Sequence, residues 1–314
     1  MGFTVGIDVG GTKIAGGVVD ERGQVLTTAR RESPATDTEA IEQTIEDLVA
    51  ELRASHEVDA VGVAAAGFID VTRSTVLFAP NLAWRDEPLR ADLERRIDIP
   101  VVIENDANAA AWGEFTFGAG EDVDDFVLVT LGTGVGGGIV LNGELLRGRF
   151  GVAAELGHMR VVPDGLECGC GNCGCWEQYA SGTALVRRAR SLADEGAPGA
   201  QVLVSHAGGE VSDIDGPLIT STAQDGDPFA VGLMESLGRW VGEGVASLAA
   251  VLDPAVVVIG GGVAEAGDLL LGPAREVFDS RLIGRGHRPS LEMRTAVLGN
   301  KAGMIGAADL ARRP

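Results

Sequence analysis

The feature that most constrains the fold is a strand–turn–strand plan that occurs twice. An apolar run over Phe3–Val9 is followed by a glycine- and threonine-containing turn and a second apolar run over residues 14–19. The same order recurs over residues 126–131 and 139–141, with the tight turn Asn142-Gly143 behind it. Two matching hairpins, each set among strands and helices, predict an α/β protein of two lobes with a ligand cleft between them.

The rest of the chain supplies the elements of such lobes. Apolar runs over residues 60–66, 99–103 and 256–259 predict buried strands, and helices are expected from about Ala107 and over residues 303–312. A further helix is predicted by one apolar stripe at helical spacing, which consists of Ile41, Ile45, Leu48, Val49 and Leu52. The length of 314 residues fits two domains at roughly 150 residues each.

Charge and hydropathy exclude several classes of partner. The net charge of −21 repels phosphate backbones, so nucleic-acid binding is not expected. The apolar runs fall short of the ~20 residues that cross a bilayer, and the N-terminus has an aspartate at position 8 where a signal peptide needs apolar residues. We therefore expect a cytoplasmic protein without membrane contact.

The two glycine turns are candidate phosphate sites, because successive backbone N–H groups form an anion-binding concavity. Ordinary hairpin turns are the alternative, and the duplication favours phosphate. The predicted residues are Asp8, Gly10, Gly11, Thr12 and Lys13 in the first turn and Gly132, Thr133 and Gly134 in the second. Residues 132–137 also fit G-x-G-x-x-G, but a strand follows where a dinucleotide fingerprint needs a helix, which disfavours an oxidoreductase.

Asn105 and Asp106 stand where a predicted strand ends and a helix begins. A carboxylate there can accept the proton of a substrate hydroxyl. The competing interpretation is a helix N-cap, a common role of Asn and Asp at this position.

A cysteine-rich segment is the most specific local signal. Cys168, Cys170, Cys173 and Cys175 lie close together, and His158 stands ten residues before the first. These five residues compete for the four places of tetrahedral zinc, whose closed shell predicts a structural metal; disulfides are disfavoured in a cytosol. Glu155 and Glu177 flank the segment and, with His158, suit hydrogen bonding to sugar hydroxyls, although solvated surface glutamates are the alternative.

Together these segments resemble a sugar kinase of the repressor–open-reading-frame–kinase (ROK) family, of the actinobacterial ATP-dependent glucokinase type. The resemblance runs nearly end to end and rests on Gly6-Ile-Asp8-Val-Gly10-Gly11-Thr12-Lys13, Glu104-Asn105-Asp106-Ala-Asn108, Leu131-Gly132-Thr133-Gly134, Glu155-Leu-Gly157-His158 and the cysteine run through Glu177. It implies an actin/hexokinase-like (ribonuclease H-like) fold. Residues 1–112 and 301–314 would form a small lobe and residues 113–300 a large lobe with the zinc loop.

The resemblance also implies roles for individual residues. Asp106 would be the general base at the 6-hydroxyl of glucose, and ATP would bind with Mg²⁺. The other sugar contacts would be Gly67, Asn105, Glu155, His158 and Glu177. The adenosine element would be Gly260, Gly261 and Gly262. Structural Zn²⁺ would be held by His158, Cys168, Cys170 and Cys175, with Cys173 outside the shell. The assembly would be a homodimer or homotetramer.

Several alternatives stay open at this point. The sugar could be N-acetylglucosamine, N-acetylmannosamine or fructose, and polyphosphate could replace ATP as donor. A sugar-sensing regulatory protein is the non-enzyme alternative. A DNA-binding repressor is not expected, because the first predicted strand starts at residue 3 and leaves no room for a helix-turn-helix.

Overall fold

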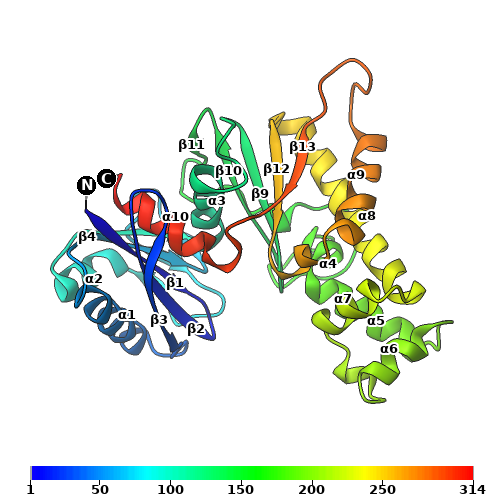
Figure 1. The fold of residues 1–314 in the computed structure, drawn as a ribbon, viewed down its shortest axis with the longest axis horizontal. Coiled ribbons are helices and arrows are strands. Elements are labelled where there is room, and N and C mark those ends of the chain that lie inside the picture. Colours follow the sequence, from blue (N-terminus) through cyan, green and yellow to red (C-terminus); the bar gives the residue numbers. More distant parts are fainter. Residues whose placement is uncertain (1, 314) are drawn as a thin grey trace. The chain divides into compact units, whose positions relative to one another are not determined.

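The structure is a computed structural model that describes residues 2–313. Met1 and Pro314, the two ends of the predicted small lobe, lie outside the described residues. The chain divides into two compact units, the first made of residues 1–128, 137–154 and 297–314 and the second of residues 129–136 and 155–296. Each unit contains both strands and helices, so the predicted α/β class is confirmed (Figure 1).

The first unit is built on a five-stranded sheet of order β3-β2-β1-β4-β8. Its strands are β1 (Phe3–Val9), β2 (Lys13–Val19), β3 (Val25–Glu32), β4 (Val58–Ala65) and β8 (Val101–Asn105). β1, β4 and β8 run parallel, while β2 and β3 are antiparallel. Because carboxyl ends of parallel strands meet at one edge, the register of Asp8 with Ala64 and of Ala65 with Asn105 brings Asp8 and Asn105 to the same edge.

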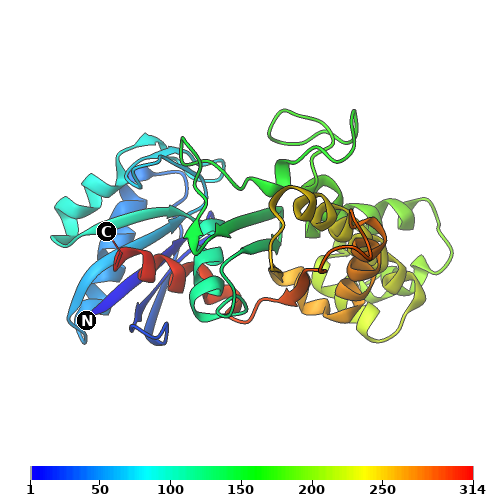
Figure 2. The ribbon, with the colours of Figure 1, turned by 90° about the horizontal axis from the view of Figure 1, so that it is seen from above.

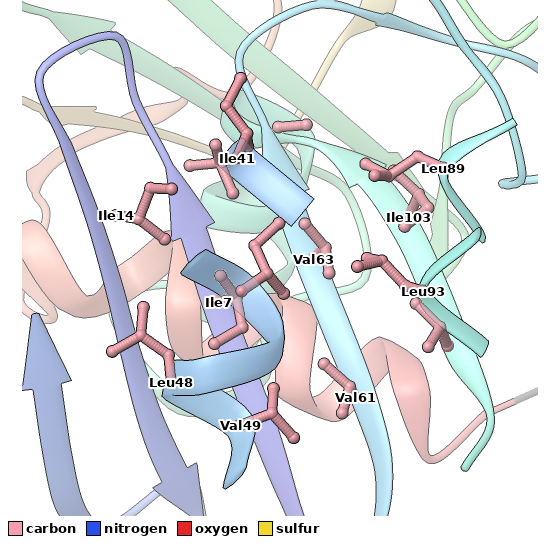
Figure 3. Packing of buried hydrophobic residues seen from close by; sticks show 14 of the residues in the cluster. Ile7, Ile14, Ile41, Leu48, Val49, Val61, Val63, Leu89, Leu93 and Ile103 are labelled. Carbon is pink, nitrogen blue, oxygen red and sulfur yellow. The ribbon is translucent and has the colours of Figure 1, made fainter. Parts of the chain in front are cut away.

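One face of this sheet is covered by α1 (Thr38–Arg53) and α2 (Leu89–Ile97), over an aliphatic core (Figure 3). Every residue of the predicted helical stripe in α1 is buried, so that prediction is confirmed. The side chain of Asp37 caps α1 by accepting the N–H of Ala40. A small antiparallel sheet of β5 (Phe68–Ile69), β6 (Val76–Phe78) and β7 (Arg85–Glu87) follows β4 in the chain.

The other face carries α10 (Ala302–Ala311), which also packs against α3 (Asp106–Phe117). Figures 1 and 2 both show the C-terminal helix beside the N-terminal strand. Glycines permit this close approach: a Cβ on Gly6 would overlap the carbonyl oxygen of Met304, and one on Gly62 would overlap that of Ala307. The helix therefore lies directly on the strand backbones.

The first unit extends beyond the lobe expected from the sequence. The expected boundary at residue 112 falls inside α3, which continues to Phe117. Residues 137–154 also belong to this unit, where Gly138 lies against Ala111. The return segment begins at Val297. Its first two residues are attached to α3, because the carboxylate of Glu114 accepts the backbone N–H groups of Val297 and Leu298.

A second five-stranded sheet has the order β11-β10-β9-β12-β13. Its strands are β9 (Phe126–Leu131), β10 (Val135–Leu141), β11 (Glu144–Leu145), β12 (Val256–Gly260) and β13 (Glu292–Thr295). The sequence analysis placed Val135 and the glycines after it in a turn, whereas they form the start of β10. Glycine suits this strand because a Cβ on Gly138 would overlap that of Ala111.

Most of the regular structure of the second unit is helical, and none of its helices was predicted from the sequence. They are α4 (Glu177–Ala180), α5 (Gly182–Asp194), α6 (Ala200–His206), α7 (Gly216–Gln224), α8 (Pro228–Leu252) and α9 (Asp268–Arg281). Short 3₁₀ turns are η1 (Leu156–His158), η2 (Val211–Asp213), η3 (Gly262–Ala266) and, in the first unit, η4 (Gly299–Lys301). Among residues 2–313, no helix has the length and apolar character that a membrane crossing requires.

Candidate active site

Asn105 is held by hydrogen bonds at the carboxyl end of β8. Its Oδ1 accepts the backbone N–H of Asn108 at 3.0 Å, and its Nδ2 donates to the carbonyl of Gly67 at 3.1 Å. The N-cap considered for this pair therefore falls on Asn105, and Asp106 becomes the first residue of α3. Asp106 is partly buried. The structure thus brings Gly67, Asn105 and Asp106 together in the first unit.

The β1–β2 turn lies at the same sheet edge. The N–H of Gly10 donates to the carbonyl of Lys13 at 3.0 Å, and Thr12 and Lys13 are exposed. A Cβ on Gly303 of α10 would lie 3.7 Å from the carbonyl oxygen of Asp106 and 3.9 Å from Cγ of Asp8. Burial raises the pKa of Asp8, and the positive charge of Lys13 partly opposes that rise.

The second predicted turn belongs to the second unit. The N–H of Gly132 donates to the carbonyl of Gly134 at 3.0 Å, while the carbonyl of Gly132 accepts the N–H of Gly182 at 2.8 Å. Gly261 has a φ of 85°, and a Cβ there would overlap the carbonyl oxygen of Leu131. Only glycine meets both demands, so the 260–262 segment lies directly against the end of β9.

A cavity of about 1000 Å³ opens beside these segments within the second unit. Gly132, Thr133 and Gly262 line it, whereas Gly134, Gly260 and Gly261 do not. Its volume is at the upper end of the range for small-molecule sites, roughly 300–1,000 Å³. The structure thus joins the predicted second turn and the predicted adenosine segment in one pocket.

Helical residues that no sequence motif predicted form the walls of this cavity. They come from α5 and α7 and include Thr183, Arg190, Pro217, Thr220 and Gln224. Arg190 is fixed in place because its Nε and Nη2 donate to the carbonyl of Ile214 at 3.0 and 2.8 Å. No motif marks these residues, since their proximity to Thr133 arises from the packing of separate helices.

The cysteine segment forms a compact group of ligand atoms. One atom each from His158, Cys168, Cys170 and Cys175 lies within 4.8 Å of the other three, and Cys173 is not part of the group. Sγ of Cys170 is 3.6 Å from Sγ of Cys175, and Sγ of Cys168 is 3.7 Å from Nδ1 of His158. Zn–S bonds of about 2.3 Å at tetrahedral angles put sulfurs about 3.8 Å apart, so these residues fit zinc.

Glu177 lies beside this group at the start of α4. Its Oε1 is 2.9 Å from Sγ of Cys168 and 3.7 Å from Nδ1 of His158, and its side chain is 20% exposed. Its other oxygen faces Gly134, where a Cβ would come within 2.8 Å. These contacts distinguish Glu177 from a freely solvated glutamate. Glu155 is more exposed, but partial burial of its carboxylate and the charge of Glu177 raise its pKa, while His158 opposes the rise. Glu155, His158 and Glu177 all belong to the second unit.

The chain belongs to the ROK family, whose family model matches residues 4–314. It is 52% identical over 314 residues to a glucokinase of Streptomyces coelicolor, which covers 100% of this chain and 99% of that protein. It is 37% identical to a glucokinase of Halalkalibacterium halodurans, over 98% of this chain and 94% of the relative.

A solved structure resembles the whole chain. It is a ROK family glucokinase from Streptomyces griseus in complex with glucose and AMPPNP, with a TM-score of 0.90, 54% identity and 100% coverage of both chains. The predicted family and the hexokinase-like fold class are therefore confirmed.

Proposed function

We propose that this chain is a glucokinase that transfers the terminal phosphoryl group of ATP to the 6-hydroxyl of glucose, yielding glucose 6-phosphate. The observation that carries the proposal is its full-length similarity, at 54% identity, to a glucokinase solved with glucose and AMPPNP. The sites described above supply chemistry suited to that reaction.

Asn105 and Asp106 provide the groups for the sugar side. A side-chain amide has two N–H donors and two lone pairs on its oxygen. Asn105 uses one N–H donor for the carbonyl of Gly67 and one oxygen lone pair for the N–H of Asn108. One N–H donor and one lone pair are therefore left for two sugar hydroxyls. Asp106, the next residue, acts as general base and accepts the proton of the 6-hydroxyl, a contribution of about 10²–10⁴-fold in rate.

The glycine segments provide the nucleotide side. The cavity beside Thr133 and Gly262 accepts the adenosine, and the backbone N–H groups of the two turns bind phosphate oxygens. Asp8 is a desolvated carboxylate, and a nearby cation would stabilise its charged form. Asp8 therefore fits the Mg²⁺ that accompanies ATP. In such in-line transfers the protein mainly positions the reactants and stabilises their charge.

The cysteine group provides a structural zinc site. His158, Cys168, Cys170 and Cys175 match the ligand types and spacing of a closed tetrahedral shell, which has no open position for chemistry. Bound zinc supplies rigidity to this segment. His158 uses Nδ1 on the side of the cysteines, so its Nε2 is left to donate to a sugar hydroxyl, and Glu177 is held close by.

A coupled assay over a panel of sugars and donors tests the proposal. Glucose with Mg-ATP is expected to give the highest kcat/KM. A clear preference for N-acetylglucosamine, N-acetylmannosamine or fructose, or for polyphosphate as donor, would replace the proposed substrate. Absence of turnover with every pair would favour the sugar-sensing regulatory protein.

A further inference from the structure

Glu104 is a buried carboxylate directly behind the candidate sugar residues. Its side chain is 1% exposed, and Nε of Arg73 and Nε of Arg147 lie 2.9 and 2.8 Å from its Oε2. Its Oε1 accepts the backbone N–H of Asn105 at 2.9 Å and Nδ2 of Asn108 at 3.3 Å. Oε2 of Glu104 therefore contacts the two arginines, while Oε1 accepts hydrogen bonds from the residues where β8 ends and α3 begins.

Arg147 connects this carboxylate to a second segment. Its guanidinium donates to the carbonyls of Val71 and Asp70 at 2.7 and 2.9 Å. That loop follows β5 and is continuous with Gly67, whose carbonyl accepts Nδ2 of Asn105. The contacts form a closed ring that runs from Glu104 through Arg147 and the loop to Asn105 and back.

Arg73 reinforces the ring from the same loop. Its φ of 55° is left-handed, a conformation that few non-glycine residues adopt. Its carbonyl accepts the N–H of Ile103 in β8 at 3.3 Å, while its side chain pairs with Glu104. The loop is therefore attached to β8 through both backbone and side chain.

Stability alone is a poor explanation for this arrangement. A buried ion pair often contributes no more than well-packed apolar side chains of the same volume, because desolvation offsets the attraction. What the ring supplies is geometry, since charge-assisted hydrogen bonds fix several backbone groups at once. The groups fixed here are those on either side of Asp106.

We propose that Glu104 is a positioning residue for phosphoryl transfer, which acts by holding Asn105, the first turn of α3 and the Gly67 loop in register with Asp106. This inference rests on the proposed function. Glu104 does not itself meet the sugar, because its carboxylate is buried and both of its oxygens are engaged by the protein.

Glu104→Gln is the first test. The amide keeps an oxygen for the N–H of Asn105 but presents an NH₂ group to the two arginines in place of a carboxylate. Misplacement of a catalytic group by about 1 Å can cost on the order of 100-fold in rate, so we expect kcat to fall by about 10–100-fold. The KM for glucose is expected to rise by about 10-fold as Asn105 shifts. The KM for ATP should stay within about twofold, because the cavity lies on other elements.

Glu94→Gln is the matched control, because Glu94 lies on α2 and contacts the opposite end of β8. Glu94 pairs with Arg90 at 3.0 Å, and its Oε1 accepts the N–H of Val101 at 3.1 Å. It thus shares the carboxylate–arginine–backbone pattern of Glu104, but its backbone partner Val101 stands at the other end of β8 from Asn105. We expect its kcat and both KM values to match the wild type.

Arg147 gives a second route if Glu104→Gln folds poorly. Arg147→Lys keeps a positive charge near Glu104 but cannot bridge the carbonyls of Asp70 and Val71. Arg147→Met loses the charge as well as the hydrogen bonds to these carbonyls. We expect the lysine variant to recover part of the kcat that the methionine variant loses. Hydrogen exchange of the peptide over residues 104–110 should speed up in Glu104→Gln and Arg147→Met but not in Glu94→Gln.

The measurements distinguish failure of the proposed function from failure of the inference about Glu104. A wild type that phosphorylates no hexose overturns the proposed function. If the wild type is active and Glu104→Gln merely lowers the melting temperature, with kcat, the KM for glucose and hydrogen exchange of the folded protein unchanged, Glu104 is structural and only the present inference fails. Equal kinetic losses in Glu94→Gln and Glu104→Gln would reduce the effect to general weakening of β8 and would also overturn it.

Discussion

The indole N–H of Trp176 donates a hydrogen bond of 2.8 Å to the carbonyl of Trp240 in α8. Trp176 is fully buried, and a Cβ on Gly244, one turn further along α8, would overlap its ring. Cys175 precedes this tryptophan and Glu177 follows it. The helix therefore fixes a proposed zinc ligand and a proposed sugar ligand through the single side chain between them.

Zinc content is the first prediction. We expect one zinc per chain in purified protein by elemental analysis, and loss of that zinc in Cys168→Ser. The same variant should bind glucose at least about 10-fold more weakly by calorimetry, because partners that orient a ligand typically contribute 10–100-fold.

Cys173→Ser is the matched control, since Cys173 lies outside the ligand group. It should retain zinc and glucose affinity. Zinc loss in this variant with retention in Cys168→Ser would show that the ligand set has been assigned wrongly.

The second prediction concerns Asp106→Ala. Removal of the general base should lower kcat by about 10²–10⁴-fold, while the affinity for glucose stays within about an order of magnitude, since the other hydroxyl contacts remain. Steady-state kinetics and calorimetry together separate the two effects.

Asp268→Ala is its control, because Asp268 is likewise the first residue of a helix. It should leave kcat unchanged. Comparable activity of Asp106→Ala and the wild type would reduce Asp106 to a residue that supports the helix terminus.

The third prediction tests the close approach of α10. Gly62→Ala places a Cβ against the carbonyl of Ala307, and we expect the free energy of unfolding to fall by about 1–3 kcal/mol from overpacking. Gly232→Ala in α8 has nothing within 4 Å, so it should instead stabilise the protein by about 0.5–1 kcal/mol. Urea denaturation measures the free energy of unfolding of both variants. Equal changes in the two variants would contradict the tight contact between α10 and the sheet.

The fourth prediction concerns the pH dependence conferred by Asp70. Burial raises its pKa, but hydrogen bonds from the Thr72 side chain and the N–H groups of Ser74, Thr75 and Thr72 outweigh burial and lower the pKa to about 2. A lowered folded-state pKa stabilises the protein above the unfolded value of about 3.9. That stabilisation is lost as pH falls toward 2.

Asp70→Asn should therefore lower the free energy of unfolding by about 1 kcal/mol at pH 7, after discounting for solvent screening. The difference from the wild type should stay constant down to about pH 5 and shrink below it. Urea denaturation of both proteins at pH 7, 5 and 3 provides the comparison. A difference that stays the same at pH 3 or grows on acidification would mean that Asp70 has no such network.

Local patterns carried most of the successful predictions. The stripe of α1 was readable from its helical period, and the strands β1, β4 and β9 were readable as short continuous apolar runs. Helix α3 shows no such stripe, because small and apolar residues surround much of it. Helix α8 does carry an apolar stripe at helical spacing, which includes Leu233, Leu237, Val241, Val245 and Leu248, but we did not predict this helix. We predicted α3 only from its alanine-rich start.

The parts of the candidate site that the sequence analysis missed depend on distant contacts. Arg190 and Thr220 line the cavity only because α5 and α7 pack beside the end of β9. Glu104 stands 31 residues from Arg73, and nothing in the chain near either residue indicates that they pair. Cysteines and glycine turns were predictable because their chemistry is confined to a short segment.

The position of α10 on β1 and β4 has a consequence for biosynthesis. At roughly 5–20 residues per second, a ribosome needs on the order of tens of seconds between emitting the first strand and emitting this helix. Until then the glycine-bearing face of β1 and β4 lacks its covering helix, whereas all of the second unit has already been translated. The unit whose translation begins first therefore cannot complete its fold until synthesis of the chain is almost finished, and its sheet stays uncovered on one face for that time.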